Sequence, residues 1–147
     1  MYLTRSPLTL STLIDEVASA DRGGIVSFLG TVRDHHGGRE VRALSYSAYD
    51  PMAESVSAEI VAEAAARWPV RIALQHRLGD LEIGDVAVAI AVAGGHRDEA
   101  FAACRYVIEE LKRRVPIWKR EIFADGTEEW VNEGVARSEE RGETAAQ

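Results

Sequence analysis

The two lysines of this chain are the residues whose type and spacing most suggest chemistry. The sequence has 15 Arg but only two Lys, Lys112 and Lys119, which lie on either side of Pro116. A lysine amine can lose its proton and act as a nucleophile or proton carrier, whereas a guanidinium stays charged. Two ordinary surface lysines are the competing interpretation, because the clustering alone is a weak signal.

Both lysines belong to the basic segment LKRRVPIWKRE of a chain that is acidic overall. Neighbouring positive charge and partial burial make a lysine amine easier to deprotonate. Pro116 ends a predicted helix, which permits Lys112 on its last turn and Lys119 on the next strand to face one pocket. Cations that compensate the helix C-terminus are the alternative, which suits Arg113 and Arg114 well and Lys119 poorly.

A second cluster lies in AGGHRDEAF, where His96 and Arg97 precede a predicted helix. Helix N-termini bind anions through unpaired amides and the helix dipole. An Arg and a His placed there would add charge-assisted hydrogen bonds to a phosphate or carboxylate. A turn with a solvated Arg97 and a helix cap at Asp98 explains the same residues equally well.

Other candidate groups are weaker. Arg33 ends a predicted strand in GTVRDHHGGRE, before a polar, Gly-containing loop. Adjacent histidines in such a loop are more often solvated than metal-bound, so we expect His35 and His36 to be solvated and no metal site. We predict that His76 is a hydrogen-bonded core histidine and that Cys104 has a packing role.

Composition excludes several classes of protein. The 147 residues are 28% charged and 46% hydrophobic, as in one ordinary globular domain. A net charge of -7 argues against a general nucleic-acid binder. The single cysteine excludes an intrachain disulfide, and no apolar run has the length of a membrane span. Without a secretory signal pattern, we expect a cytoplasmic protein with no membrane contact.

Hydrophobic periodicity predicts the elements that must position these residues. The run GIVSFLGTV reads as a buried strand, and VAVAIAVA as a strand covered on both sides. The expected class is α+β, with a mostly antiparallel sheet and helices packed on it. We expect one domain over residues 1–131 and a flexible polar tail over 132–147. The predicted helices cover 10–18, 52–68 and 97–115; the predicted strands cover 24–32, 41–48, 70–77, 86–93 and 117–123, with a hairpin into Trp130; 33–40 and 79–85 are expected as loop and turns.

In this order and spacing, the strings FLGTVRDH, AYDPMAE, RWPV, HRLGDLEIGD, GGHRDEAF and LKRRVPIWKRE resemble the large, catalytic subunits of molybdopterin synthase, the MoaE family. The resemblance runs from about Gly24 to Trp130. It implies an α/β-hammerhead type of fold and a sulfurtransferase of molybdenum cofactor biosynthesis. Such an enzyme inserts two sulfurs into cyclic pyranopterin monophosphate to make the dithiolene of molybdopterin, and no cofactor is expected.

The resemblance also implies partners. Sulfur arrives as a thiocarboxylate on the C-terminal GlyGly of a small ubiquitin-like, MoaD-like carrier subunit. The large subunit is expected to form a homodimer with one small subunit at each end, a heterotetramer. The present sequence ends in Ala-Ala-Gln and not in GlyGly, so we expect the sulfur carrier to be a separate chain.

The family's functional positions map onto this chain residue by residue. Lys112 matches the essential catalytic lysine, and Lys119 matches a second active-site lysine. The family usually has a small polar residue where this chain has Gly94 and Gly95 before the HisArg pair. The resemblance implies substrate binding by Thr31, Val32, Arg33, His96, Arg97, Lys112, Lys119, Arg120 and Glu121.

For the chemistry, we hypothesise that Lys112 is the general acid/base or the transient partner of the acyl group, and that Lys119 orients the substrate. A non-catalytic module that senses a nucleotide or pterin phosphate would explain Arg33 and the HisArg pair. It would not explain two lysines that flank Pro116. A purely structural dimerisation domain would explain VAVAIAVA but would leave the cations without a role.

Overall fold

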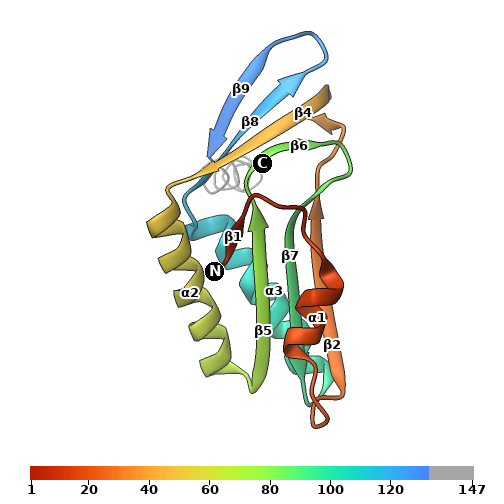
Figure 1. Ribbon diagram of the computed structural model, residues 1–147, viewed down its shortest axis with the longest axis vertical. Coiled ribbons are helices and arrows are strands. Elements are labelled where there is room, and N and C mark those ends of the chain that lie inside the picture. The colour runs from red at the N-terminus through yellow and green to blue at the C-terminus, as the bar shows by residue number, and fades with distance from the viewer. Residues whose placement is uncertain (133–147) are drawn as a thin grey trace, which may run out of the picture.

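The computed structural model describes residues 1–132, which form two sheets and three helices (Figure 1). This arrangement confirms the predicted α+β class. The predicted tail lies outside the described residues apart from Asn132, which ends the last strand. In chain order the elements are β1 Leu3–Thr4, α1 Leu10–Val17, β2 Gly24–Thr31, β3 His35–His36, β4 Arg39–Ala48, α2 Asp50–Arg67, β5 Val70–Arg77, β6 Gly79–Glu82, β7 Val86–Gly94, α3 Arg97–Arg114, β8 Ile117–Phe123 and β9 Glu128–Asn132.

The first sheet has the order β1-β5-β7-β2, with β1 parallel to β5 and the other neighbours antiparallel. Its centre is β7, whose valines and Ile90 pack into the larger core, which includes the buried face of α3. The alanines on the other face of β7 pack beneath Leu13 and Val17 of α1. Figure 1 shows α1 in front of this sheet and α3 behind it. The prediction that both faces of β7 are covered is therefore confirmed.

The prediction that β2 is a buried strand is wrong. β2 forms the edge of the first sheet, and Ile25, Phe28 and Leu29 are 41%, 38% and 40% exposed. Within residues 1–132, β7 is the only strand that pairs with β2, so the apolar side chains of β2 are less covered than those of β7. An apolar edge of this kind is typical of a surface that binds another chain.

The second sheet has the order β3-β4-β8-β9, with β6 also paired to β4, and it crosses one end of the first sheet (Figure 1). Two segments that the sequence predicted to be a loop and turns, residues 33–40 and 79–85, therefore contain strands. In residues 33–40, Gly37 and Gly38 have φ of 58° and 78°, which permits a tight two-residue hairpin turn between β3 and β4. In residues 79–85, β6 pairs with the centre of β4.

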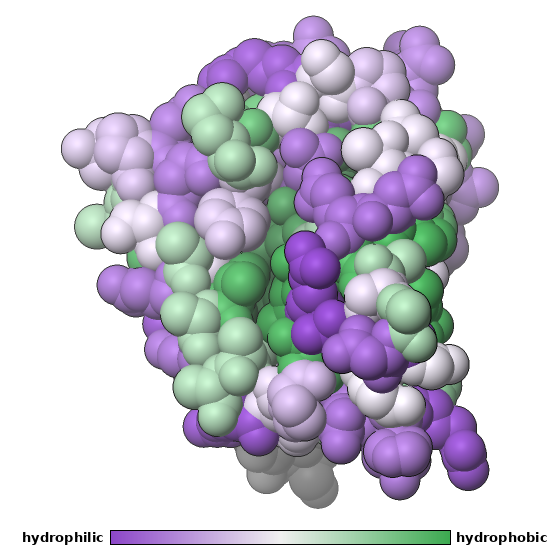
Figure 2. Space-filling model, turned by 60° about the horizontal axis from the view of Figure 1, so that its bottom comes forward, coloured by the Kyte–Doolittle hydropathy of each residue, from purple (hydrophilic) through white to green (hydrophobic). Residues whose placement is uncertain are grey.

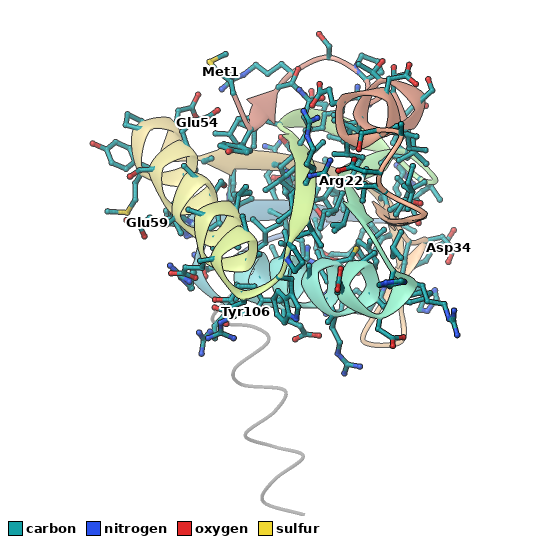
Figure 3. The ribbon with its side chains drawn as sticks, turned by 90° about the horizontal axis from the view of Figure 1, so that it is seen from below. Met1, Arg22, Asp34, Glu54, Glu59 and Tyr106 are labelled. Carbon is teal, nitrogen blue, oxygen red and sulfur yellow. The ribbon has the colours of Figure 1, made fainter. Side chains whose placement is uncertain are left out.

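The long helices α2 and α3 lie side by side. Arg114 of α3 donates to Glu63 of α2 at 2.6 Å, and the Tyr106 hydroxyl donates to the same carboxylate at 2.7 Å. Figure 3 shows Tyr106 on α3 beside α2. Phe101 of α3 is 60% exposed, because the buried face of this helix runs through Ala100, Cys104 and Val107. Within residues 1–132, no helix is both long enough and apolar enough to cross a membrane.

Candidate active site

A hollow with about 330 Å³ of atom-free space, part of it open to solvent, lies where β2 ends beneath β4 and β8. Five of the predicted site residues line it, three from the end of β2 and two from β8. Tyr46 and His36 line it as well. The predicted residues are Thr31, Val32, Arg33, Lys119 and Glu121.

Strand geometry explains why these side chains meet. Lys119 and Glu121 are two residues apart on β8, so they point to the same face. Lys119 pairs in register with Tyr46. At the end of β2, Val32 is only 4% exposed, and its backbone bonds to the 84–85 turn (N–H to the Asp85 carbonyl at 3.0 Å). Val32 is therefore a buried anchor, and Arg33 beyond it is exposed.

A buried carboxylate lies at the base of the hollow. The side chain of Glu121 is 2% exposed, and its Oε1 is 2.5 Å from His36 Nδ1 and 3.5 Å from Lys119 Nζ. His36 is therefore not a solvated loop residue, and that prediction is wrong. His35 also borders the hollow but is exposed as predicted, and its Nδ1 lies 2.8 Å from Asp34 Oδ1. The Asp34 carboxylate points away from the body of the protein (Figure 3).

Lys112 lines a second, more apolar hollow with His76, Val88, Ile108, Leu111, Val115 and Ile117. The His76 ring is 7% exposed and donates from Nδ1 to the Arg77 carbonyl at 2.9 Å, which confirms the hydrogen-bonded core histidine. Tyr46 and His76 meet edge to face at 5.0 Å between ring centroids. This ring pair connects the two hollows, because Tyr46 lines the first and His76 lines the second.

The two lysines therefore line adjoining hollows. Ile117 borders the Lys112 hollow and precedes Lys119 by two residues on the same face of β8. Two residues along a strand span about 7 Å. Pro116 ends α3 and lets the chain return as β8, as the sequence predicted.

His96 and Arg97 do not lie near either of these two hollows. They are exposed at the N-terminus of α3, while Lys112 is on its last turn. Lys112 follows Arg97 by fifteen positions along the helix, a rise of about 22 Å. The structure thus places the HisArg pair at the opposite end of the first sheet, the end brought forward in Figure 2, where hydrophilic residues surround hydrophobic ones.

Arg120 also points away from the hollow. It alternates with Lys119 and Glu121 on β8, so its guanidinium lies on the other face. There it is 3.7 Å from Glu128 and lies over Trp130 at 5.7 Å. Within one chain, Arg120 is therefore part of the β8–β9 hairpin and not of the hollow.

Packing explains the glycine at position 94. A Cβ on Gly94 would lie 3.1 Å from the His96 carbonyl oxygen and 3.3 Å from a Val70 methyl group. A Cβ on Gly95 would meet nothing within 4 Å. A side chain at Gly94 would therefore require the start of α3 and Val70 to shift slightly, whereas a small polar residue would fit at Gly95.

Cys104 is 4% exposed, and burial raises the pKa of its thiol to about 11. This confirms its predicted packing role, since a buried thiol that stays protonated is a poor nucleophile. Among the described residues, no three His, Cys, Asp or Glu side chains are grouped so that they could hold a metal ion.

Comparison with known proteins identifies the family. A family model described as MoaE protein matches residues 3–114. A molybdopterin synthase catalytic subunit of Nostoc is 40% identical over 134 residues, covering 90% of this chain and 81% of the relative. The catalytic subunit 1 of Mycobacterium tuberculosis is 44% identical over 132 residues, covering 89% of each chain. The crystal structure of molybdopterin synthase from Staphylococcus aureus matches with a TM-score of 0.84 and 37% identity, covering 88% of this chain and 95% of that one.

The family model includes Lys112, and these relatives each cover about nine-tenths of the chain. They confirm the resemblance first seen in the sequence strings. The chain belongs to the MoaE protein family.

Proposed function

We propose that this chain, with residues 1–131 as one catalytic domain, is the catalytic subunit of a molybdopterin synthase. It transfers sulfur from the C-terminal thiocarboxylate of a small ubiquitin-like carrier to cyclic pyranopterin monophosphate, forming the molybdopterin dithiolene. The observation that carries this proposal is the position of both lysines on adjoining hollows at one end of the fold. A family relationship alone would not assign a role to either amine.

The two hollows suit the two parts of the reaction. Arg33 and Lys119 provide positive charge and hydrogen-bond donors for the cyclic phosphate. Apart from His76, the other side chains that line the Lys112 hollow are apolar. An amine that borders such a hollow is placed to exchange a proton with an acyl group bound there, or to attack its carbonyl carbon. We assign Lys112 to general acid/base catalysis or transient acyl bonding, and Lys119 to orienting the substrate.

A separate sulfur donor follows from the cysteine content. Cys104 is the only cysteine of the chain, and it is buried with its thiol protonated. The sulfur must therefore come from another molecule, and the thiocarboxylated tail of a carrier subunit meets that need. We place the reaction in the cytoplasm, where a free thiol persists.

The distance between Arg97 and Lys112 supports a homodimer with shared sites. β2 runs from Gly24, beside the start of α3, to Thr31 at the hollow. A second copy packed antiparallel along the exposed apolar edge of β2 would bring its Arg97 end toward this hollow. Each anionic substrate would then meet Arg33 of one subunit and the HisArg pair of the other. With one carrier at each outer end, the assembly is a heterotetramer.

The proposed activity is tested by mixing the chain with a thiocarboxylated carrier and cyclic pyranopterin monophosphate and measuring dithiolene formation. The chain alone is expected to be inactive, and the complete mixture active. Lys112→Ala should abolish product formation while leaving the fold and carrier binding intact. Substrate binding without turnover by the wild-type mixture would instead support the sensor of a pterin phosphate.

Shared sites are tested by co-expressing Arg97→Ala and Lys119→Ala chains with different tags and purifying the mixed dimer. If Arg97 acts on the partner's hollow, one of the two sites in the mixed dimer carries both defects and the other carries none. About half of the wild-type activity should then return. If both residues serve the same chain's hollow, each site keeps one defect and the mixed dimer stays as inactive as its parents.

A further inference from the structure

The buried Glu121 carboxylate has a partner that the proposed reaction does not use. An ionised carboxylate in an apolar interior is stable only when cations or hydrogen-bond donors satisfy it. The Glu121 side chain is 2% exposed, and its Oε1 is shared by two such groups, His36 and Lys119. The relative strength of these two contacts with Glu121 Oε1 therefore determines where the Lys119 ammonium lies.

His36 is the closer of the two partners. Its Nδ1 lies 2.5 Å from Glu121 Oε1, close enough for a direct hydrogen bond. Lys119 Nζ lies 3.5 Å from the same oxygen, beyond the usual range for an N–H···O hydrogen bond. The carboxylate is thus engaged mainly by the imidazole, while the Lys119 side chain lines the hollow together with Arg33.

The hairpin that carries His36 is anchored independently of Glu121. Gly37 and Gly38 turn the chain, and Arg39, which pairs with His36, donates to Glu129 at 2.8 Å. The Arg39 guanidinium also lies over the Phe123 ring at 3.6 Å from its centroid. These contacts tie the β3–β4 turn to the β8–β9 hairpin. The His36 ring is therefore held over β8 by its own backbone and is not merely drawn there by the carboxylate.

We propose that His36 is a positioning residue for Lys119: by engaging the buried Glu121 carboxylate, it keeps the Lys119 ammonium from closing onto Glu121 and so holds it at the hollow where the anionic substrate is proposed to bind. Within residues 1–132, His36 and Lys119 are the cationic side chains near Glu121 Oε1, so loss of the imidazole would leave that oxygen to Lys119. The ammonium would then move about 0.7 Å closer to reach ordinary hydrogen-bond distance. Displacements of this size can cost up to about 100-fold in rate when they misplace a reacting or orienting group.

The proposal rests on the proposed function where it concerns turnover. Steady-state kinetics with thiocarboxylated carrier and cyclic pyranopterin monophosphate should show kcat about 10-fold lower in His36→Ala, with KM for the carrier within about twofold of wild type. His36→Asn keeps an N–H donor near the position of Nδ1 and should restore kcat to within about threefold of wild type. A wild-type kcat in His36→Ala, or no recovery in His36→Asn, would overturn the proposal.

A second measurement does not depend on activity. Because the chain has only two lysines, selective ¹³Cε-lysine labelling gives two NMR signals, which Lys119→Arg assigns. In His36→Ala the Lys119 signal should shift while the Lys112 signal stays in place, and His36→Asn should return it toward its wild-type position. His35→Ala is the matched control, because that ring borders the same hollow but is 64% exposed and contacts Asp34 instead of Glu121. It should leave the Lys119 signal in place.

The two measurements separate the two claims. A wild-type complex that forms no dithiolene contradicts the proposed function, and the lysine spectra still decide the role of His36. A Lys119 signal that is unmoved in His36→Ala, or moved equally in His35→Ala, contradicts the positioning role whatever the activity.

Discussion

Two carboxylate-centred clusters of this protein hold cations in opposite settings. Glu63, between α2 and α3, has a side chain that is 40% exposed, and it accepts hydrogen bonds from Arg114 and Tyr106. Glu121, on β8, is 2% exposed and contacts His36 and Lys119. The first cluster joins two helices, and the second forms the base of a hollow.

The two clusters differ in whether the side chains that contact the carboxylate can release a proton. The guanidinium of Arg114 stays charged at any working pH, and its bond to Glu63 holds the pKa of that carboxyl down at about 2. The same contact with Glu63 raises the pKa of the Tyr106 hydroxyl. Histidine and lysine, by contrast, are residue types whose side chains can release a proton. The exposed cluster thus joins two helices through a fixed arginine charge, whereas the buried cluster contains the residue types used for proton transfer.

The largest effect on stability is expected at the buried cluster. Glu121→Ala leaves Lys119 and His36 without their shared carboxylate in a mostly buried site. Loss of one partner from such a site should lower the free energy of unfolding by about 3 kcal/mol. Urea denaturation at pH 7 measures this change, with Glu63→Ala as the exposed counterpart. If Glu63→Ala destabilises the protein more, the ranking of the two clusters is reversed.

A smaller, pH-dependent effect is expected at the exposed cluster. The pKa of Glu63 is lowered from 4.5 to about 2 by the hydrogen bond from Arg114, then that from Tyr106. The carboxylate therefore stabilises the fold fully above about pH 4.5, and this contribution disappears as the pH falls through about 2. Glu63→Gln should be less stable than wild type at pH 7, and the difference should shrink on acidification. A difference that is constant between pH 7 and pH 2.5 would contradict this assignment.

The two clusters are also expected to differ in how salt changes their contribution to stability. The Glu63 cluster is open to solvent, so 1 M NaCl should reduce the destabilisation caused by Glu63→Gln. The destabilisation caused by Glu121→Ala should change less, because counterions have little access to a carboxylate that is 2% exposed. Equal salt dependence of the two variants would show that both clusters are solvated alike.

The smallest effect is expected at Cys104, which belongs to neither cluster. Because burial raises its thiol pKa to about 11, iodoacetamide at pH 8 should leave the native protein unmodified and fully active. Mass spectrometry before and after unfolding in urea checks this result. Rapid alkylation of the folded chain, with loss of activity, would give the thiol a role that the two lysines are proposed to fill.

Much of the fold was predictable because periodicity reports local packing. VAVAIAVA predicted a strand covered on both faces, and Pro116 predicted the turn from α3 to β8. Periodicity carries no information about sheet order, so it could not show that β2 lies at an edge, with Phe28 exposed. The turn signal Gly37-Gly38 does predict a two-residue hairpin, and that signal was available in the sequence.

The candidate site was predictable only in part. Motif spacing identified Arg33, Lys112 and Lys119, which the structure places on adjoining hollows. The distance along α3 already implied that Arg97 lies far from Lys112 in one chain. The contact of His36 with Glu121 joins positions 85 residues apart, and no local pattern reports such a pair.

The most direct test of the account is the turnover of Lys112→Arg, assayed with thiocarboxylated carrier and cyclic pyranopterin monophosphate. Arginine preserves the positive charge but removes the amine, and Arg114→Lys is the reciprocal control at the exposed cluster. The account predicts that Lys112→Arg loses at least about 100-fold in kcat, or about 2.7 kcal/mol of transition-state stabilisation, while Arg114→Lys turns over at the wild-type rate. Normal turnover by Lys112→Arg would contradict the claim that this chain keeps lysine where an amine is required.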